Sequence, residues 1–170
     1  GLWMVFLALR FQKKIPRWTR QDLFGLSHVR SSGRMLWFWP IITGLVIAVI
    51  ASFLSVKYFS HVVSPFSEAL DLAEVSWIIA GFLGVAVLIV PFIEEVIFRG
   101  FFFNVLKECQ GRWLAFGIVG MAFGVLHMDQ YWGDWAGIVV IFILGFLLTA
   151  FRMVSGSARS AIVLHYTFNM

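Results

Sequence analysis

Long runs without any charged side chain constrain this sequence more than any other feature. One run covers residues 36–56, and two more cover residues 77–93 and 135–151. A helix needs about 20 apolar residues to cross a hydrocarbon layer of about 30 Å, so the first run is long enough to span a membrane and the other two nearly are. We therefore expect an integral membrane protein.

The composition agrees with this interpretation. Hydrophobic residues make up 61% of the 170 residues and charged residues only 13%, which is far more apolar than a soluble domain of this length. Two shorter apolar runs, residues 113–126 and 158–170, are interrupted by polar side chains. We predict an all-α fold, a polytopic transmembrane helical bundle of about five to six membrane segments.

The charges outside the apolar runs alternate in sign along the chain. Residues 10–34 carry seven basic side chains against the single acid Asp22. The later connections are in turn acidic, basic, acidic and basic: Glu68, Asp71 and Glu74; Lys107 and Arg112; Asp129 and Asp134; Arg152 and Arg159. Because cytoplasmic loops are enriched in Lys and Arg, one topology satisfies every connection, with the 10–34 segment in the cytoplasm. We expect the protein to lie in the bacterial inner membrane. We expect no nucleic-acid partner, since the sequence has no polar domain that could carry a basic groove.

We expect the chain to be a fragment that divides into two parts. The sequence starts at Gly1 without a methionine and stops at Met170 inside an apolar run, so we expect a fragment truncated at both ends. Residues 1–35 would hold a partial N-terminal helix and the basic cytoplasmic segment, including a short helix capped by Thr19 and Asp22. Residues 36–170 would form the transmembrane bundle.

Six polar side chains interrupt the apolar runs in the second half of the chain: Glu94, Glu95, Arg99, His127, His165 and Asn169. A charge within the membrane costs about 2.5 to 3.5 kcal/mol on insertion scales, so these side chains should meet and satisfy one another. If the third and fourth segments form a hairpin that turns near Gln110 and Gly111, Glu94 and His127 lie at the same depth, because both are equally far from the turn.

Helical spacing predicts which way several of these side chains face. Glu95 and Arg99 are four residues apart and should form an ion pair. His165 and Asn169 have the same spacing and should project from one face. Phe123 precedes His127 by one turn on a face that we expect to pack against another helix through small residues, namely Gly117, Gly120 and Gly124.

Three short segments carry a resemblance to a known family. "EEVIFRG", "FGVLH" and "HYTFN" resemble the motifs E-E-x-x-x-R, F-x-x-x-H and H-x-x-x-N of the CPBP family, the Rce1-like or CAAX-processing intramembrane glutamic proteases. The motifs occur in this order, each in its own apolar segment, between residues 94 and 169. The resemblance implies a helical membrane bundle with its catalytic core at residues 77–170, and hydrolysis of a peptide bond in a membrane-associated, in eukaryotes prenylated, protein or peptide.

The same resemblance implies a role for each residue of the motifs. Glu94 would activate water with the assistance of His127, while His165 and Asn169 would stabilise the oxyanion. Glu95, Arg99 and Phe123 would support the site structurally. No cofactor is expected.

Three other functions are compatible with the same residues. Glu94, His127 and His165 could bind zinc in a membrane metalloprotease, although the sequence has no H-E-x-x-H motif. Buried carboxylates and histidines also occur in proton-coupled transporters, although we find no internal repeat of the kind that transporters show. A noncatalytic membrane immunity protein could keep the same fold.

Overall fold

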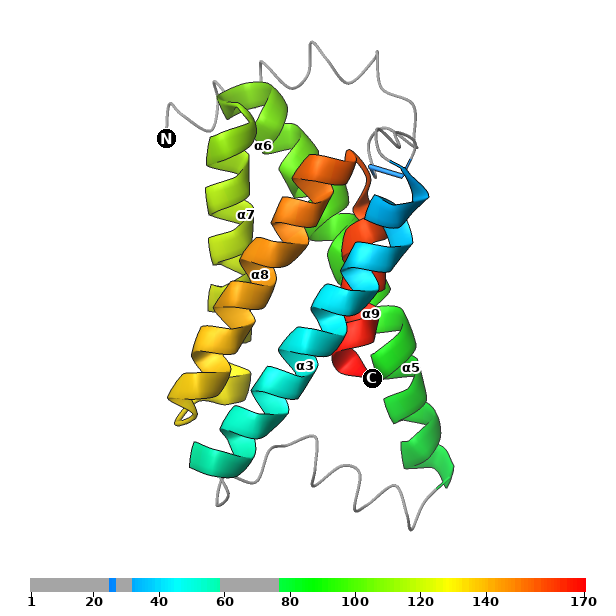
Figure 1. Ribbon diagram of the computed structural model, residues 1–170, viewed down its shortest axis with the longest axis vertical. Coiled ribbons are helices and arrows are strands. Elements are labelled where there is room, and N and C mark those ends of the chain that lie inside the picture. Colours follow the sequence, from blue (N-terminus) through cyan, green and yellow to red (C-terminus); the bar gives the residue numbers. More distant parts are fainter. Residues whose placement is uncertain (1–24, 27–31, 59–76) are drawn as a thin grey trace.

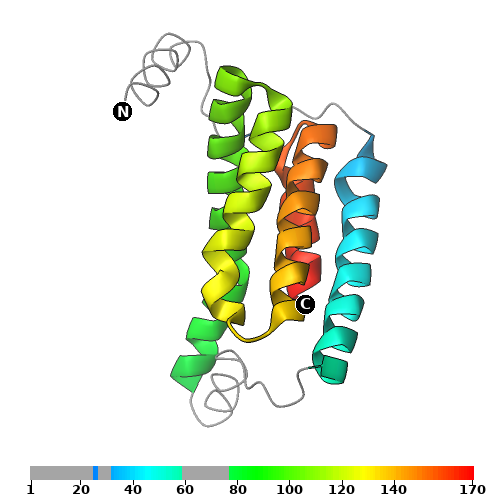
Figure 2. The same ribbon diagram turned by 90° about the vertical axis from the view of Figure 1, so that its left-hand side faces the viewer.

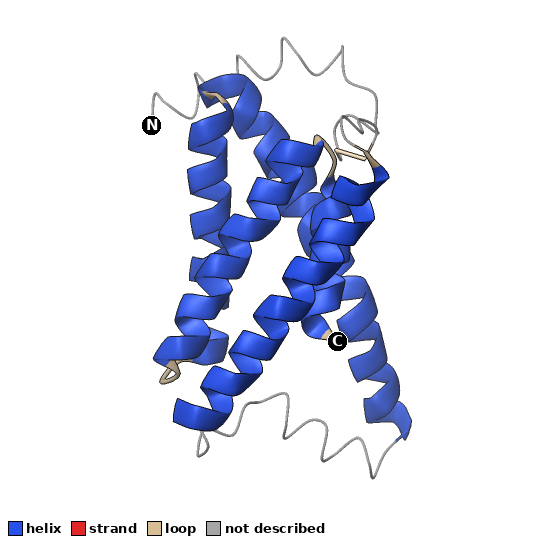
Figure 3. Ribbon diagram, viewed as in Figure 1, coloured by secondary structure: helices blue, strands red, loops and turns tan. Residues whose placement is uncertain are grey.

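A computed structural model describes residues 25–26, 32–58 and 77–170 of the chain. Every regular element in this part is helical, and no strand occurs in it (Figure 3). The predicted all-α fold is therefore confirmed. The predicted short helix capped by Thr19 and Asp22, and the acidic connection with Glu68, Asp71 and Glu74, lie outside the described residues.

The described elements follow one another through short connections after residue 77. In chain order they are η2 (Arg34–Phe38), α3 (Trp39–Tyr58), α5 (Trp77–Glu95), η3 (Val96–Phe102), α6 (Phe103–Gln110), α7 (Arg112–His127), η4 (Met128–Tyr131), α8 (Trp135–Ser155) and α9 (Ala158–Asn169). Gly111, with a φ of 90°, separates α6 from α7, and Gly156, with a φ of 76°, follows α8. Glycine adopts such positive φ values without steric cost, which allows both tight turns.

Three helical segments of the described part are long and apolar enough to cross a membrane. They are Leu36–Leu54, Trp77–Gln110 and Trp135–Ser155, which contain or largely coincide with the three longest apolar runs. α7 has 16 residues and α9 has 12, so they extend about 24 Å and 18 Å at 1.5 Å per residue. The chain is an integral membrane protein, and the two shorter helices are the ones that carry His127 and His165.

The helices are arranged so that α8 lies between α7 and α3, with α9 packed against α3, α8 and α5 (Figures 1 and 2). The start of α3, the α6–α7 turn and the α8–α9 turn lie at one end of the bundle. The end of α3, the start of α5 and η4 lie at the other end. The α6–α7 and α8–α9 connections, which the sequence analysis counts as basic, thus lie at the opposite end of the bundle from the acidic connection with Asp129 and Asp134, while the basic 10–34 segment lies largely outside the described residues.

Close packing between α7 and α8 depends on glycine. A Cβ atom built on Gly124 would lie 2.4 Å from Phe142 Cδ1, and one on Gly120 would lie 2.6 Å from Phe146 Cδ1. Only a residue without a side chain allows these rings to approach the α7 backbone, so the predicted small-residue face is correct at both positions. The prediction was wrong for Gly117, where an added Cβ would meet nothing within 4 Å.

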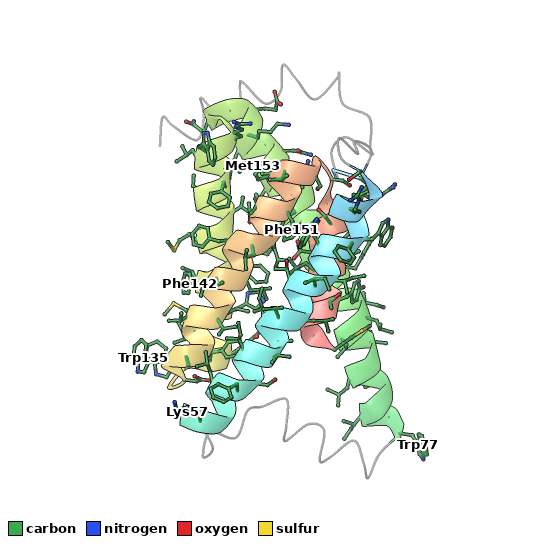
Figure 4. The ribbon with its side chains drawn as sticks, viewed as in Figure 1. Lys57, Trp77, Trp135, Phe142, Phe151 and Met153 are labelled. Atoms are coloured by element: carbon green, nitrogen blue, oxygen red, sulfur yellow. The ribbon has the colours of Figure 1, made fainter. Side chains whose placement is uncertain are left out.

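The surface of α3 and α5 is almost entirely apolar. Large hydrophobic side chains are exposed along both helices, and α5 extends away from the bundle toward Trp77 at its outer end (Figure 4). Such surfaces are stable in contact with lipid chains but not with water. The buried core lies instead between α7, α8 and α9, where Phe123, Leu144 and Leu164 are fully buried.

Candidate active site

Glu94, in the last turn of α5, lies between two histidines from other helices. Its Oε1 atom is 3.4 Å from Nε2 of His127, which ends α7, and its Oε2 atom is 3.9 Å from Nε2 of His165 on α9. The Glu94 side chain is 23% exposed and the His127 side chain is 13% exposed, so neither is fully enclosed by the protein. The structure thus places Glu94 level with His127, as the hairpin argument predicted, and adds His165 to the same group.

The His127 ring is held on its other side by its own helix. Nδ1 of His127 lies 2.8 Å from the backbone oxygen of Phe123, and because a carbonyl only accepts, Nδ1 must donate. The ring also stacks on Phe123, with centroids 4.2 Å apart. Since Phe123 is fully buried, the imidazole cannot turn freely, and Nε2 remains directed at Glu94.

Glu95 and Arg99 form the predicted ion pair. Nη1 of Arg99 donates to Oε1 of Glu95 at 2.8 Å, and both side chains are fully buried. Nη2 of Arg99 donates to the backbone oxygen of Gly145 on α8 at 2.9 Å, and the guanidinium carbon lies 4.3 Å from the centre of the Phe123 ring. These contacts tie the end of α5 to both α7 and α8.

His165 has a second acidic neighbour that sequence reasoning missed. Its Nδ1 lies 2.9 Å from Oε1 of Glu95, the same oxygen that binds Arg99. Glu95 therefore contacts the site on one side and the structural arginine on the other. The two residues are 70 positions apart, and no spacing rule connects helices that are not joined by a turn.

Asn169 is not brought into this group. It is the last residue of α9, one turn after His165, and it is exposed. The structure gives it no polar contact with the described residues. Asn169 and His165 lie four residues apart in one continuous helix, so they share a helix face, as predicted.

The backbone that follows the two glutamates is unusual. Residues Val96–Phe102 form a π-helical segment, η3, which widens the helix and rotates the side chains after it. Such segments are rare and often occur at functional sites. Here the segment carries Arg99, and it joins α5 to α6 without a break in the chain of helices.

Arg152 fixes this π-helical segment from α8, and sequence reasoning missed this role as well. Its Nε donates to the backbone oxygen of Arg99 at 2.8 Å, and its Nη2 donates to Oδ1 of Asn104 at 2.7 Å. The prediction that Arg152 belongs to a basic connection is wrong, because it lies in α8 and is only 5% exposed. Its position at the end of an apolar run, like that of Arg99, was the signal that could have identified it.

No group of three His, Cys, Asp or Glu side chains in the described part of the chain is arranged to hold a metal ion. The predicted zinc ligands are nevertheless the three side chains that converge. Nδ1 of His127 donates to a carbonyl, and both histidines direct Nε2 at Glu94, an arrangement in which a carboxylate can take a proton from water or exchange one with an imidazole.

The fold and the site together define an integral membrane protein with a glutamate–histidine centre buried among its helices. Residues 76–170, more than half of the chain, match the family model of the type II CAAX prenyl endopeptidase Rce1-like proteins. The chain belongs to this family. A search of the curated proteins and a search of the solved structures gave no match. The Rce1-like family is a family of proteases, and the matched region contains every candidate site residue.

Proposed function

We propose that the protein is an intramembrane endopeptidase that hydrolyses a peptide bond of a membrane-associated protein or peptide. The observation that carries this proposal is the convergence of two Nε2 atoms on the partly exposed carboxylate of Glu94, at 3.4 and 3.9 Å. A general base must lie within hydrogen-bonding reach of the water that it activates, and Glu94 is the acidic side chain of this group that remains accessible. Membership of a CAAX endopeptidase family supports the same conclusion.

In the proposed reaction Glu94 accepts a proton from water as the water oxygen attacks the substrate carbonyl. His127 assists, because its Nε2 faces Glu94 while its Nδ1 is engaged by the Phe123 carbonyl. A ring held in this way can share the proton and pass it to the departing amine without changing orientation. Proton transfer by a positioned side chain typically contributes about 10²- to 10⁴-fold to the rate.

The negative charge that develops on the carbonyl oxygen needs hydrogen-bond donors. We propose His165 and Asn169 for this role. His165 Nε2 is directed at the same space as Glu94, and Asn169 follows it by one helical turn. Donors fixed at the place where charge develops are usually the largest single contribution to catalysis.

The substrate should reach the site from the membrane, since the surrounding helices expose apolar surface along α3 and α5. We propose a membrane-anchored peptide, with a lipidated cysteine as one form of anchor, and no cofactor. The basic 10–34 segment would lie in the cytoplasm and the protein in the bacterial inner membrane, following the excess of Lys and Arg in that segment.

The proposal can be tested with the purified full chain in lipid nanodiscs. Peptides that share one sequence but carry a prenyl anchor, an acyl anchor or no anchor would be incubated with it, and the products identified by mass spectrometry. We expect cleavage at one peptide bond of the anchored peptides, and little cleavage of the free one. A folded, correctly inserted protein that cleaves none of a broad set of anchored peptides would contradict the proposal.

A further inference from the structure

One oxygen of Glu95 binds two partners that belong to different parts of the molecule. Oε1 accepts a hydrogen bond from Arg99 Nη1 at 2.8 Å and lies 2.9 Å from His165 Nδ1. Glu95 is fully buried and His165 is nearly so. The spacing of Glu95 from Arg99 suggested that the ion pair was the only contact of this carboxylate. The structure shows that the carboxylate also contacts His165.

We infer that Glu95 is a positioning residue for His165, which sets the orientation and the tautomer of its ring. This inference rests on the proposed function, because it assigns how one of the proposed oxyanion donors is held. An ionised carboxylate can only accept hydrogen bonds, so the proton on the His165 ring must reside on Nδ1. Nε2 is then the nitrogen that faces Glu94, 3.9 Å away.

This tautomer has a consequence for the chemistry at Nε2. A neutral ring with its proton on Nδ1 presents a lone pair at Nε2 and can only accept there. To donate to an oxyanion, Nε2 must already carry a second proton, taken up from solvent before the reaction, because the proton that Glu94 removes from water goes to the departing amine. The charge of Glu95 beside Nδ1 would balance the imidazolium formed in this way, as the buried aspartate does in a Ser-His-Asp triad.

The neighbours of Glu95 hold it in the position that this role requires. Arg99 links the carboxylate to the Gly145 carbonyl on α8, with hydrogen bonds of 2.8 and 2.9 Å. The edge of Phe123 lies against the His165 ring, with centroids 5.7 Å apart and planes at 79°. The ring is thus held by a hydrogen bond on one side and by packing on another, so that its Nε2 atom stays directed at Glu94.

The first test measures the ring directly and needs no turnover. The protein would be labelled with ¹⁵N-histidine, and the signal of His165 among the four histidines of the sequence assigned by its loss in His165→Ala. We expect a protonated, hydrogen-bonded Nδ1 on His165, and a changed signal in Glu95→Gln. An unprotonated Nδ1 on His165 in the unchanged protein would overturn the inference, whether or not the protein is a peptidase.

The second test asks whether Glu95 acts through His165. We expect Glu95→Gln to lower kcat by at least about 10-fold, and by no more than the roughly 10² to 10³ that loss of one oxyanion donor costs, with KM nearly unchanged. In the His165→Ala background the same substitution should have almost no further effect on kcat. An equal loss in both backgrounds would show that Glu95 acts independently of His165.

A matched control is available in Glu108→Gln, which makes the same chemical change on α6 beside Lys107 and far from this group. We expect it to leave kcat, KM and the His165 signal unchanged. A comparable loss of kcat in this control would mean that the effect of Glu95→Gln is not specific to the site, and would refute the inference.

Discussion

Replacing Gly145 by alanine should force α7 and α8 apart. A Cβ atom at this position would lie 2.7 Å from the backbone oxygen of Gly120, and real Cβ atoms essentially never approach closer than 3.0 Å. The two helices must therefore separate by at least 0.3 Å, the difference between these distances. The obstacle is backbone, so no side-chain rotation can relieve the contact.

The expected change in stability combines two opposite effects. Inserting a carbon into a well-packed interface costs about 1 to 3 kcal/mol, while alanine is favoured over glycine inside a helix by about 1 kcal/mol. Gly117→Ala provides the matched control, because an added Cβ there meets nothing within 4 Å and only the helix preference remains. We therefore expect Gly145→Ala to be less stable than Gly117→Ala by about 1 to 3 kcal/mol.

Unfolding of the two variants and the unchanged protein can be followed by circular dichroism in mixed micelles of increasing SDS fraction. Gly145→Ala should also lose turnover, because the carbonyl of Gly145 accepts the hydrogen bond from Arg99. A Gly145→Ala protein as stable as Gly117→Ala would refute the packing argument, since it would mean that α7 and α8 do not approach as closely as described.

Three further predictions concern the metal, the donors and the topology. Exhaustive chelation should leave most of the peptidase activity intact, and elemental analysis should find well under one metal ion per chain. If the protein contained one zinc ion per chain, lost activity when the zinc was removed and regained it when zinc was returned, the metalloprotease would be favoured. His165→Ala or Asn169→Ala should each lower kcat by about 10² to 10³ with little change in KM; an equal loss of substrate binding would indicate a role in helix packing instead. In a Cys109→Ser background, a cysteine at Gly156 should be protected from an impermeant thiol reagent added outside the cell and one at Gln130 should react, and the reverse pattern would invert the proposed orientation.

The parts of the site that the sequence predicted depend on contacts within one helix or across one tight turn. Glu95 and Arg99 meet because residues four apart share a helix face. This contact forms within one helix and does not depend on how the helices pack. Glu94 and His127 meet because α5–α6 and α7 are joined at Gly111, and positions at equal distance from a turn lie at equal depth. In both cases the distance along the chain determines the distance in space.

The contacts that could not be predicted join helices without a shared turn. The bonds from His165 to Glu95 and from Arg152 to the Arg99 carbonyl depend on how α8 and α9 are rotated about their axes. The π-helical turn of η3 adds a further rotation that regular helical spacing does not include. The glycine face was likewise only partly correct, since an added Cβ would meet α8 side chains at Gly120 and Gly124 but nothing within 4 Å at Gly117.

The turnover of Glu94→Gln tests most directly whether the carboxylate of Glu94 activates the water. The substitution keeps the size of the side chain and removes its ability to accept a proton. We expect a folded, normally inserted protein whose kcat on an anchored peptide is lower by about 10² to 10⁴, the contribution of a positioned general base. A Glu94→Gln protein that retains kcat within a few-fold of the unchanged protein would contradict the account.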